Sequence, residues 1–96
     1  MYSLVIKNRA LLMMQDAFDW YEEQRPGLGE EFLEELDVCF SKISRTPTFY
    51  GFIDKSFRRF ALDRFPYAVI YEVIESDIVV YAVFHNSRNP DKRFED

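Results

Sequence analysis

Residues 57–90 read FRRFALDRFPYAVIYEVIESDIVVYAVFHNSRNP, and this stretch decides the fold. It holds three β-rich segments in succession, at about 57–62, 67–74 and 78–85, because β-branched and aromatic residues dominate each of them. The last segment runs directly into His85, Asn86, Ser87 and Arg88. Polar side chains where a strand leaves a sheet are common functional positions in small domains. We therefore expect function to be concentrated in this C-terminal third.

Two amphipathic helices are predicted before these strands. A short β-like run at residues 2–6 is followed by Asn8, which can cap the first helix. The apolar residues of that helix recur at helical spacing: Leu11, Met14, Phe18 and Tyr21. Pro26 and Gly27 end it, and the second helix begins near Gly29, with an apolar stripe of Phe32, Leu36, Cys39 and Ile43. The sequence thus predicts an α+β domain with the order β-α-α-β-β-β.

Size, charge and cysteine content narrow the class of protein. Ninety-six residues form a single domain, 1–96. The net charge is −5, with five Lys/Arg against ten Asp/Glu in residues 1–54 and seven of each in residues 55–96. Such an acidic balance disfavours nucleic-acid binding on electrostatic grounds. The single cysteine, Cys39, excludes an internal disulfide and a Cys-based zinc site, so we expect no metal and no cofactor.

The hydropathy of the sequence indicates where in the cell the protein is expected. No apolar run approaches the roughly 20 residues that span a bilayer, and no signal peptide is recognisable at the start of the chain. We therefore expect a cytoplasmic protein without a membrane partner.

The hairpin of the last two strands carries the argument for a partner. Ser76 and Asp77 suit a two-residue turn, which would pair Val73 with Val80, Tyr71 with Ala82, and Val69 with Phe84, and turn these six residues toward the helices. The opposite face would then carry Ala68, Ile70, Glu72, Ile74, Val79, Tyr81, Val83 and His85. Two helices cover only one face of a small sheet, so we expect a partner chain on the second. The alternative is a strand pair buried beneath the loop at residues 46–56.

Three segments carry a resemblance to a known family: WYEEQRPGLG at 20–29, RRFALDRFPYAVIYEV at 58–73, and IVVYAVFHNSRNP at 78–90. With the β-α-α-β-β-β order, the chain resembles, from about residue 2 to 93, the toxins of the RelE/ParE superfamily, also called plasmid stabilisation proteins. The resemblance implies a small, twisted, mainly antiparallel sheet with a helical hairpin on one face. It also implies the toxin of a type II toxin–antitoxin pair, neutralised by a small antitoxin.

The superfamily offers two kinds of target. RelE-like toxins cleave messenger RNA in the ribosome with basic, aromatic or histidine side chains, whereas ParE-like toxins poison DNA gyrase. Metal-independent RNA cleavage needs a base, a cation and an acid. The residues that could supply them here are His85, Arg58, Arg59, Arg64 and Tyr67. For His85, the simpler interpretation is a strand-end histidine that orders the following turn by hydrogen bonding.

We interpret the chain as closer to the ParE-like branch, a toxin that binds a target such as gyrase and is not an enzyme. Ala68 and Ile70 stand where ribonuclease members tend to place a phosphate-binding arginine. The alternatives are a RelE-like endoribonuclease and a non-toxic, degenerate member. The expected partner contacts are Ile70, Val79, Tyr81, Val83, His85 and Arg88, with a homodimer possible when antitoxin is absent.

Overall fold

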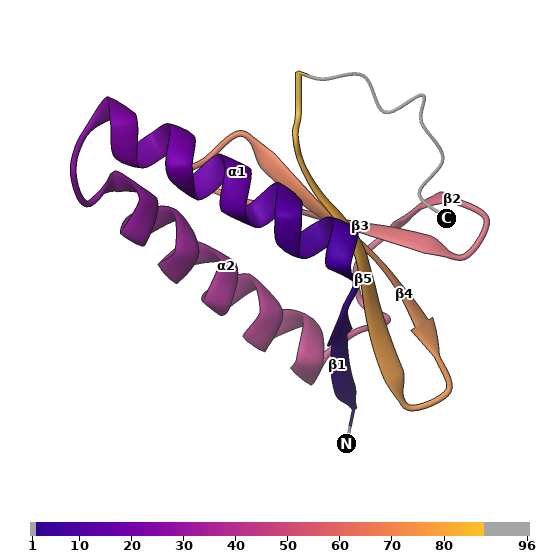
Figure 1. Cartoon of the computed structure of the whole chain (residues 1–96). Helices are drawn as coiled ribbons and strands as arrows, with labels where there is room; N and C mark the ends of the chain where they lie inside the picture. Colours follow the sequence, from indigo (N-terminus) through magenta and orange to yellow (C-terminus); the bar gives the residue numbers. More distant parts are fainter. Residues whose placement is uncertain (1, 88–96) are drawn as a thin grey trace.

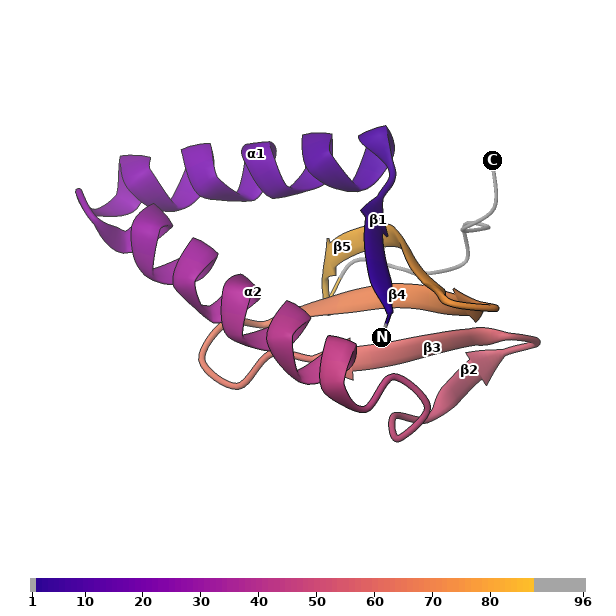
Figure 2. The ribbon, with the colours of Figure 1, turned by 90° about the horizontal axis from the view of Figure 1, so that it is seen from below.

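A helical hairpin packs on one face of a five-stranded sheet (Figures 1 and 2). The computed structural model describes residues 2–87. The elements are β1 (Ser3–Ile6), α1 (Asn8–Gln24), α2 (Leu28–Arg45), β2 (Phe52–Asp54), β3 (Phe57–Ala61), β4 (Tyr67–Ile74) and β5 (Asp77–His85). The strand order is β1-β5-β4-β3-β2; β1 runs parallel to β5, and the other neighbours are antiparallel. The α+β class and the mainly antiparallel sheet are confirmed, and no helix in the described chain is long and apolar enough to cross a bilayer.

The strand β2 is an addition to the predicted order. Its three residues lie inside the segment expected to be a loop, and they pair with the start of β3 across a register irregularity. A run this short has no measurable alternation of apolar and polar residues, which is why the sequence did not indicate a strand. All three residues are exposed, so β2 forms an edge of the sheet (Figure 2).

The register of the β4–β5 hairpin differs from the prediction. The turn is formed by Glu75 and Ser76, because Ile74 pairs with Asp77. The expected turn at Ser76-Asp77 and its three residue pairs are therefore wrong: Val73 pairs with Ile78, Tyr71 with Val80, and Val69 with Val83. Glu75 adopts a left-handed backbone with φ 55°, a conformation for which glutamate has no preference. Aspartate is a common turn residue, so the sequence favoured the wrong position.

A bulge in the same hairpin redistributes side chains between the two faces. Ile70 pairs with Ala82 while Tyr71 pairs with Val80, so Tyr81 is the extra residue on β5. Beyond the bulge the alternation is inverted. Val83 consequently packs in the core beneath the helices, whereas Ala82 and Phe84 belong to the second face, the reverse of the prediction.

The main core lies between the helical hairpin and the sheet. Its largest fully buried side chains include Phe32, Leu36, Ile43, Tyr71 and Ile78. The Tyr71 hydroxyl donates a 2.6 Å hydrogen bond to the carbonyl oxygen of Pro47, and burial raises its pKa to about 12. This hydrogen bond attaches the loop after α2 to β4, the central strand of the sheet. Cys39 is also buried here, which raises the pKa of its thiol to about 12 and keeps it protonated and unreactive.

The turn between the helices is closed by a carboxylate. Neither helix has a side-chain cap of its own: α1 begins at Asn8 without the expected asparagine cap, and the residue before α2 is Gly27, with φ 91°. Glu22 of α1 supplies the missing acceptor, since its Oε1 accepts hydrogen bonds from the backbone N–H groups of Gly27 (2.9 Å) and Gly29 (2.8 Å). A negative charge is favourable at this end of α2 because the helix dipole is positive there.

Candidate partner-binding surface and catalytic residues

Arg58 is a structural residue of the loop that precedes β2. Its Nη1 donates hydrogen bonds to the carbonyl oxygens of Thr48 (3.1 Å) and Tyr50 (2.6 Å), and its guanidinium lies 3.8 Å from the centroid of the Phe52 ring. Two carbonyl bonds and a stacked ring leave little of this cation for a phosphate.

Arg64 is held by the second helix. Its Nη2 lies 2.6 Å from Oε1 of Glu31, and Arg25 approaches the other oxygen of that carboxylate at 3.4 Å. The hydrogen bond from Arg64, assisted by Arg25, keeps the pKa of the Glu31 carboxyl below its usual value. Arg64 therefore attaches the β3–β4 loop to α2.

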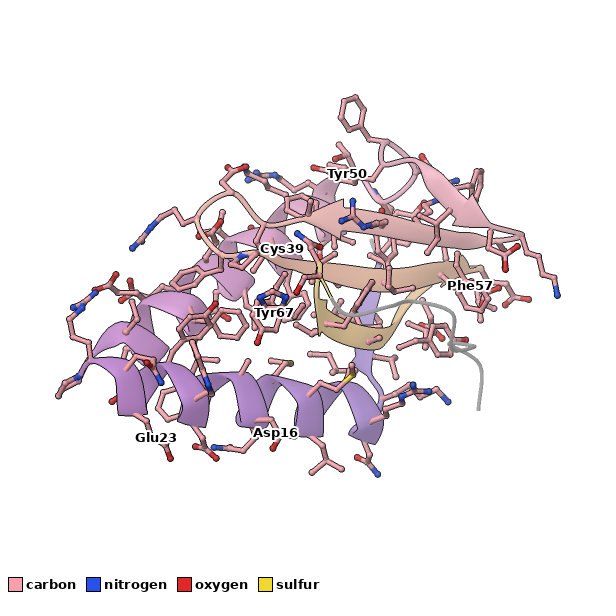
Figure 3. All side chains as sticks on the ribbon, turned by 90° about the horizontal axis from the view of Figure 1, so that it is seen from above. Asp16, Glu23, Cys39, Tyr50, Phe57 and Tyr67 are labelled. Atoms are coloured by element: carbon pink, nitrogen blue, oxygen red, sulfur yellow. The ribbon has the colours of Figure 1, made fainter. Side chains whose placement is uncertain are left out.

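Tyr67 and His85 are paired neighbours on β4 and β5. Tyr67 is buried in an aromatic cluster with Tyr21 and Phe32, between the helices and the sheet (Figure 3). The His85 ring lies edge-on to Tyr67, and its Nδ1 accepts a 3.1 Å hydrogen bond from the backbone N–H of Ser87. The Nδ1 of His85 is thus engaged in the turn that follows β5.

Arg59 lies on the other face of the sheet. It pairs with Ile70 on β4, and Ile70 belongs to the second apolar cluster, whereas Tyr67 belongs to the main core. Its Nη2 donates a 2.8 Å hydrogen bond to Oδ1 of Asn86. The five residues considered for RNA cleavage are therefore not assembled into one site: Arg58 and Arg64 are engaged in holding loops, Tyr67 is core, and Arg59 and His85 face opposite ways.

The apolar residues expected to meet a partner are mostly covered within the monomer. Ile70 is 0% and Val83 1% exposed, and Val79 is 8% exposed. Tyr81 is half-buried and donates a 2.9 Å hydrogen bond to Oε1 of Glu72. The cover of the second face comes from four side chains: Phe57, Tyr81, Phe84 and, from α1, Met13. The prediction of an uncovered second face is wrong, and Arg88 lies outside the described residues.

The helical hairpin carries an apolar groove that the sequence did not indicate. It has a volume of about 360 Å³ and is lined by Leu11, Met14, Gln15, Phe18 and Leu33. Leu11 is 46% exposed and the neighbouring Leu12 is 67% exposed. The helical spacing of these residues was visible, but periodicity alone does not show that part of the stripe extends beyond the core. The two helices that form the groove carry mostly acidic side chains, with nine Asp/Glu and one Arg in residues 16–37, and Asp19 accepts a 2.9 Å hydrogen bond from Gln15 of the groove lining.

Glu35 is a second residue whose role the sequence did not reveal. Its Oε2 accepts hydrogen bonds from the backbone N–H groups of Asp63 (2.6 Å) and Arg64 (3.0 Å) in the β3–β4 loop. The carboxylate thus joins α2 to a loop 28 residues further along the chain.

We expect Glu35→Ala to lower the free energy of unfolding by about 1–2 kcal/mol, because two backbone donors lose a charged acceptor. Glu34→Ala is the matched control, since Glu34 is exposed on the same helix and should change stability by less than about 0.5 kcal/mol. Urea titration followed by circular dichroism measures both. Equal stability of the two variants would show that these hydrogen bonds contribute nothing.

A two-helix hairpin on a small mixed sheet, with an apolar groove on the hairpin, defines a small α+β domain with one sheet face covered by the helices. A family model described as "ParE toxin of type II toxin-antitoxin system, parDE" matches residues 4–90. The chain therefore belongs to the ParE toxin family. It is the toxin component of a type II toxin–antitoxin system, and its partner is an antitoxin. No curated protein matches the sequence.

Two solved structures are similar in fold. The chromosomal ParDE toxin–antitoxin system from P. aeruginosa has a chain that is 16% identical, with 88% of this chain and 96% of that chain covered and a TM-score of 0.79. The isolated RelE toxin of E. coli is 19% identical, with 94% and 89% covered and a TM-score of 0.68. At these identities the likeness establishes the shared fold of the superfamily.

Proposed function

We propose that this toxin acts by binding a protein target, such as DNA gyrase, and not by cleaving messenger RNA. The observation that carries the proposal is the dispersal of the candidate catalytic residues. Arg58 holds carbonyl oxygens of its own loop, Arg64 is paired with Glu31, and the Nδ1 of His85 is occupied by Ser87. RNA cleavage needs a base and a cation within reach of one phosphate, and this sheet assembles no such pair among the candidates. The net charge of −5 also opposes binding to RNA.

The experiment compares the two targets directly. Purified toxin is incubated with DNA gyrase, supercoiled plasmid and ATP, and in parallel with translating ribosomes on a defined messenger RNA. We expect linear DNA from trapped gyrase cleavage complexes, together with intact messenger RNA. Cleavage of the messenger RNA without an effect on gyrase would overturn the proposal. A gyrase target would place the action of the toxin in the cytoplasm.

For the antitoxin, we propose the groove on the helical hairpin as a docking site. The groove is apolar at its base, and its surroundings are acidic, which suits an amphipathic segment with apolar anchors and basic flanks. Figure 3 shows Asp16 and Glu23 on α1, the helix that supplies most of the groove. The homodimer expected without antitoxin loses its support, because the sheet face on which it was based is covered.

We expect Leu11→Glu to weaken binding of the antitoxin encoded in the same operon by at least about tenfold, because a charge would enter the apolar base of the groove. Isothermal titration with the purified antitoxin measures the effect. Ile74→Glu is the control, since Ile74 is similarly exposed (45%) but lies at the distant β4–β5 hairpin. Unchanged binding by Leu11→Glu would contradict the assignment of the groove.

A further inference from the structure

A basic and aromatic surface lies at the edge of the sheet remote from α1, where α2 ends and β2 begins (Figure 2). Three apolar side chains stand out from it: Phe49 is 78% exposed, Phe52 59% and Ile53 42%. Two exposed cations flank them, Arg45 in the last turn of α2 and Lys55 in the turn after β2. We call these five residues the basic–aromatic edge. In Figure 3, Tyr50 marks the loop that carries this edge, and it lies across the sheet from α1, toward the β2 edge.

The loop that presents this edge is held in one conformation. Arg58 bonds to the carbonyl oxygens of Thr48 and Tyr50 and stacks on Phe52, and the buried Tyr71 hydroxyl bonds to Pro47. These contacts hold four residues of the loop: Pro47, Thr48, Tyr50 and Phe52. The exposure of the two phenylalanines is therefore a fixed property of the folded loop. A rigid aromatic side chain loses little entropy on binding, which is typical of the anchor residues of protein interfaces.

Core packing does not explain the exposed rings. The residue of this loop that packs on the core is Tyr50, which is half-buried and whose ring lies against Phe60 at a centroid distance of 4.8 Å. Phe49 touches only the outer side of Tyr50, edge-on at 5.1 Å, among the described aromatic residues. The Phe49 ring and the part of Phe52 that Arg58 does not cover are exposed to water, and apolar rings exposed in this way on a small monomer mark an interaction surface.

The charge around the edge differs in sign from the rest of the described chain. Residues 42–59 hold five Lys/Arg and one Asp, whereas residues 16–37 hold nine Asp/Glu and one Arg. Within residues 2–87, neither Arg45 nor Lys55 has a salt-bridge partner. A positive rim around apolar anchors is complementary to an acidic protein surface that offers an apolar pocket.

We propose that the basic–aromatic edge docks the toxin onto its protein target, with the two phenylalanines entering an apolar pocket bordered by acidic side chains. This inference rests on the proposed function, because it names the surface by which a protein target is recognised. A protein suits the edge better than RNA for two reasons. The net charge of −5 opposes the approach of RNA, and the donors of Arg58 Nη1 are used by carbonyl oxygens of its own loop.

The test measures binding of purified toxin variants to purified DNA gyrase by isothermal titration. Phe49→Ala/Phe52→Ala removes the anchors, Lys55→Glu reverses one rim charge, and Val5→Ala truncates a residue of β1 that is 42% exposed at the opposite edge of the sheet. We expect the double variant to bind at least about 100-fold more weakly, since each anchor is worth tenfold or more. Lys55→Glu should weaken binding several-fold at low salt and approach the wild type at high salt. Val5→Ala should bind as the wild type does.

Parallel titrations with the operon's antitoxin and with a single-stranded RNA oligomer show whether either of these ligands binds the edge instead. Urea titration checks the fold of each variant. Antitoxin binding should be unchanged by all three variants. If the wild type binds gyrase and the double variant binds equally well, the docking proposal is overturned while the proposed function stands. Loss of antitoxin binding, or of RNA binding alone, would overturn it by assigning the edge to that ligand. Failure of the wild-type toxin to bind gyrase would overturn the proposed target itself.

Discussion

Replacing Gly29 by alanine should destabilise the protein by about 3 kcal/mol, because the first turn of α2 lies directly against α1. A Cβ at this position would stand 2.7 Å from Cδ1 of Phe18, 2.8 Å from the Phe18 carbonyl oxygen and 2.8 Å from Cγ of Glu22. The ring and the glutamate side chain could move, but the carbonyl oxygen belongs to the backbone of α1. The two helices would have to separate, and this would break the hydrogen bond from the Gly29 N–H to Oε1 of Glu22.

The other glycines provide matched controls. Gly51→Ala should change stability by less than about 0.5 kcal/mol, since no atom lies within 4 Å of the added Cβ and the backbone is not left-handed. Gly27→Ala should cost about 1 kcal/mol, because its φ of 91° disfavours alanine although the space is open. Urea titration gives the free energies of unfolding. A Gly29→Ala variant as stable as Gly51→Ala would show that the helices do not approach as closely as described.

Replacing Phe32 by alanine should cost about 3–5 kcal/mol, the usual loss for a fully buried phenylalanine. Its ring is 0% exposed and packs against Tyr21, Phe65 and Tyr67 at centroid distances of 5.5, 5.3 and 5.0 Å. Truncation would open a cavity where α1, α2 and the β3–β4 region meet.

The same helix supplies the control for this variant. Val38 is 53% exposed, so Val38→Ala should cost less than about 1 kcal/mol. Thermal and urea denaturation compare the two variants. A loss below about 1 kcal/mol for Phe32→Ala would mean that the aromatic cluster is not the main contact between the hairpin and the sheet.

The helices were predictable because their signals are local. Apolar spacing and the Pro26-Gly27 turn lie within the segments they define, and α1 and α2 begin and end close to the expected residues. The identity of the capping groups was not predictable. Glu22 reaches Gly29 from another helix, and Asn8 is not used as a cap. Capping from a distant element leaves no pattern in neighbouring residues.

The β4–β5 hairpin was predicted incorrectly in its pairing because of one turn, and in its faces because of one bulge. Placing the turn one residue too late shifted the predicted register by two at Val73, which changes the partners but leaves each side chain on its face. The bulge at Tyr81 moved Ala82 and Val83 each to the face opposite to the predicted one. Both strands are apolar on both sides, so hydropathy gave no means to detect either error. The argument for a partner on that face failed for this reason.

The candidate site was only partly accessible to sequence reasoning. The residue types were noted correctly, but their partners are distant in the chain: Arg64 pairs with Glu31, and Glu35 binds the backbone of Asp63. Single-sequence patterns contain no information on such contacts. The loop at residues 46–56 was considered as a cover for the strand pair, but within it Phe49 and Phe52 are exposed, and Tyr50 packs against the core.

The central claim is that this ParE-family toxin acts without RNA-cleaving chemistry, and growth after induction of His85→Ala tests it most directly. The wild type and the variant are expressed to equal levels in cells that lack the antitoxin, and viable cells are counted over time. Because His85 serves to order the turn at Ser87, we predict that the variant arrests growth as completely as the wild type. A His85→Ala variant that folds and binds antitoxin but leaves growth unaffected would contradict the account.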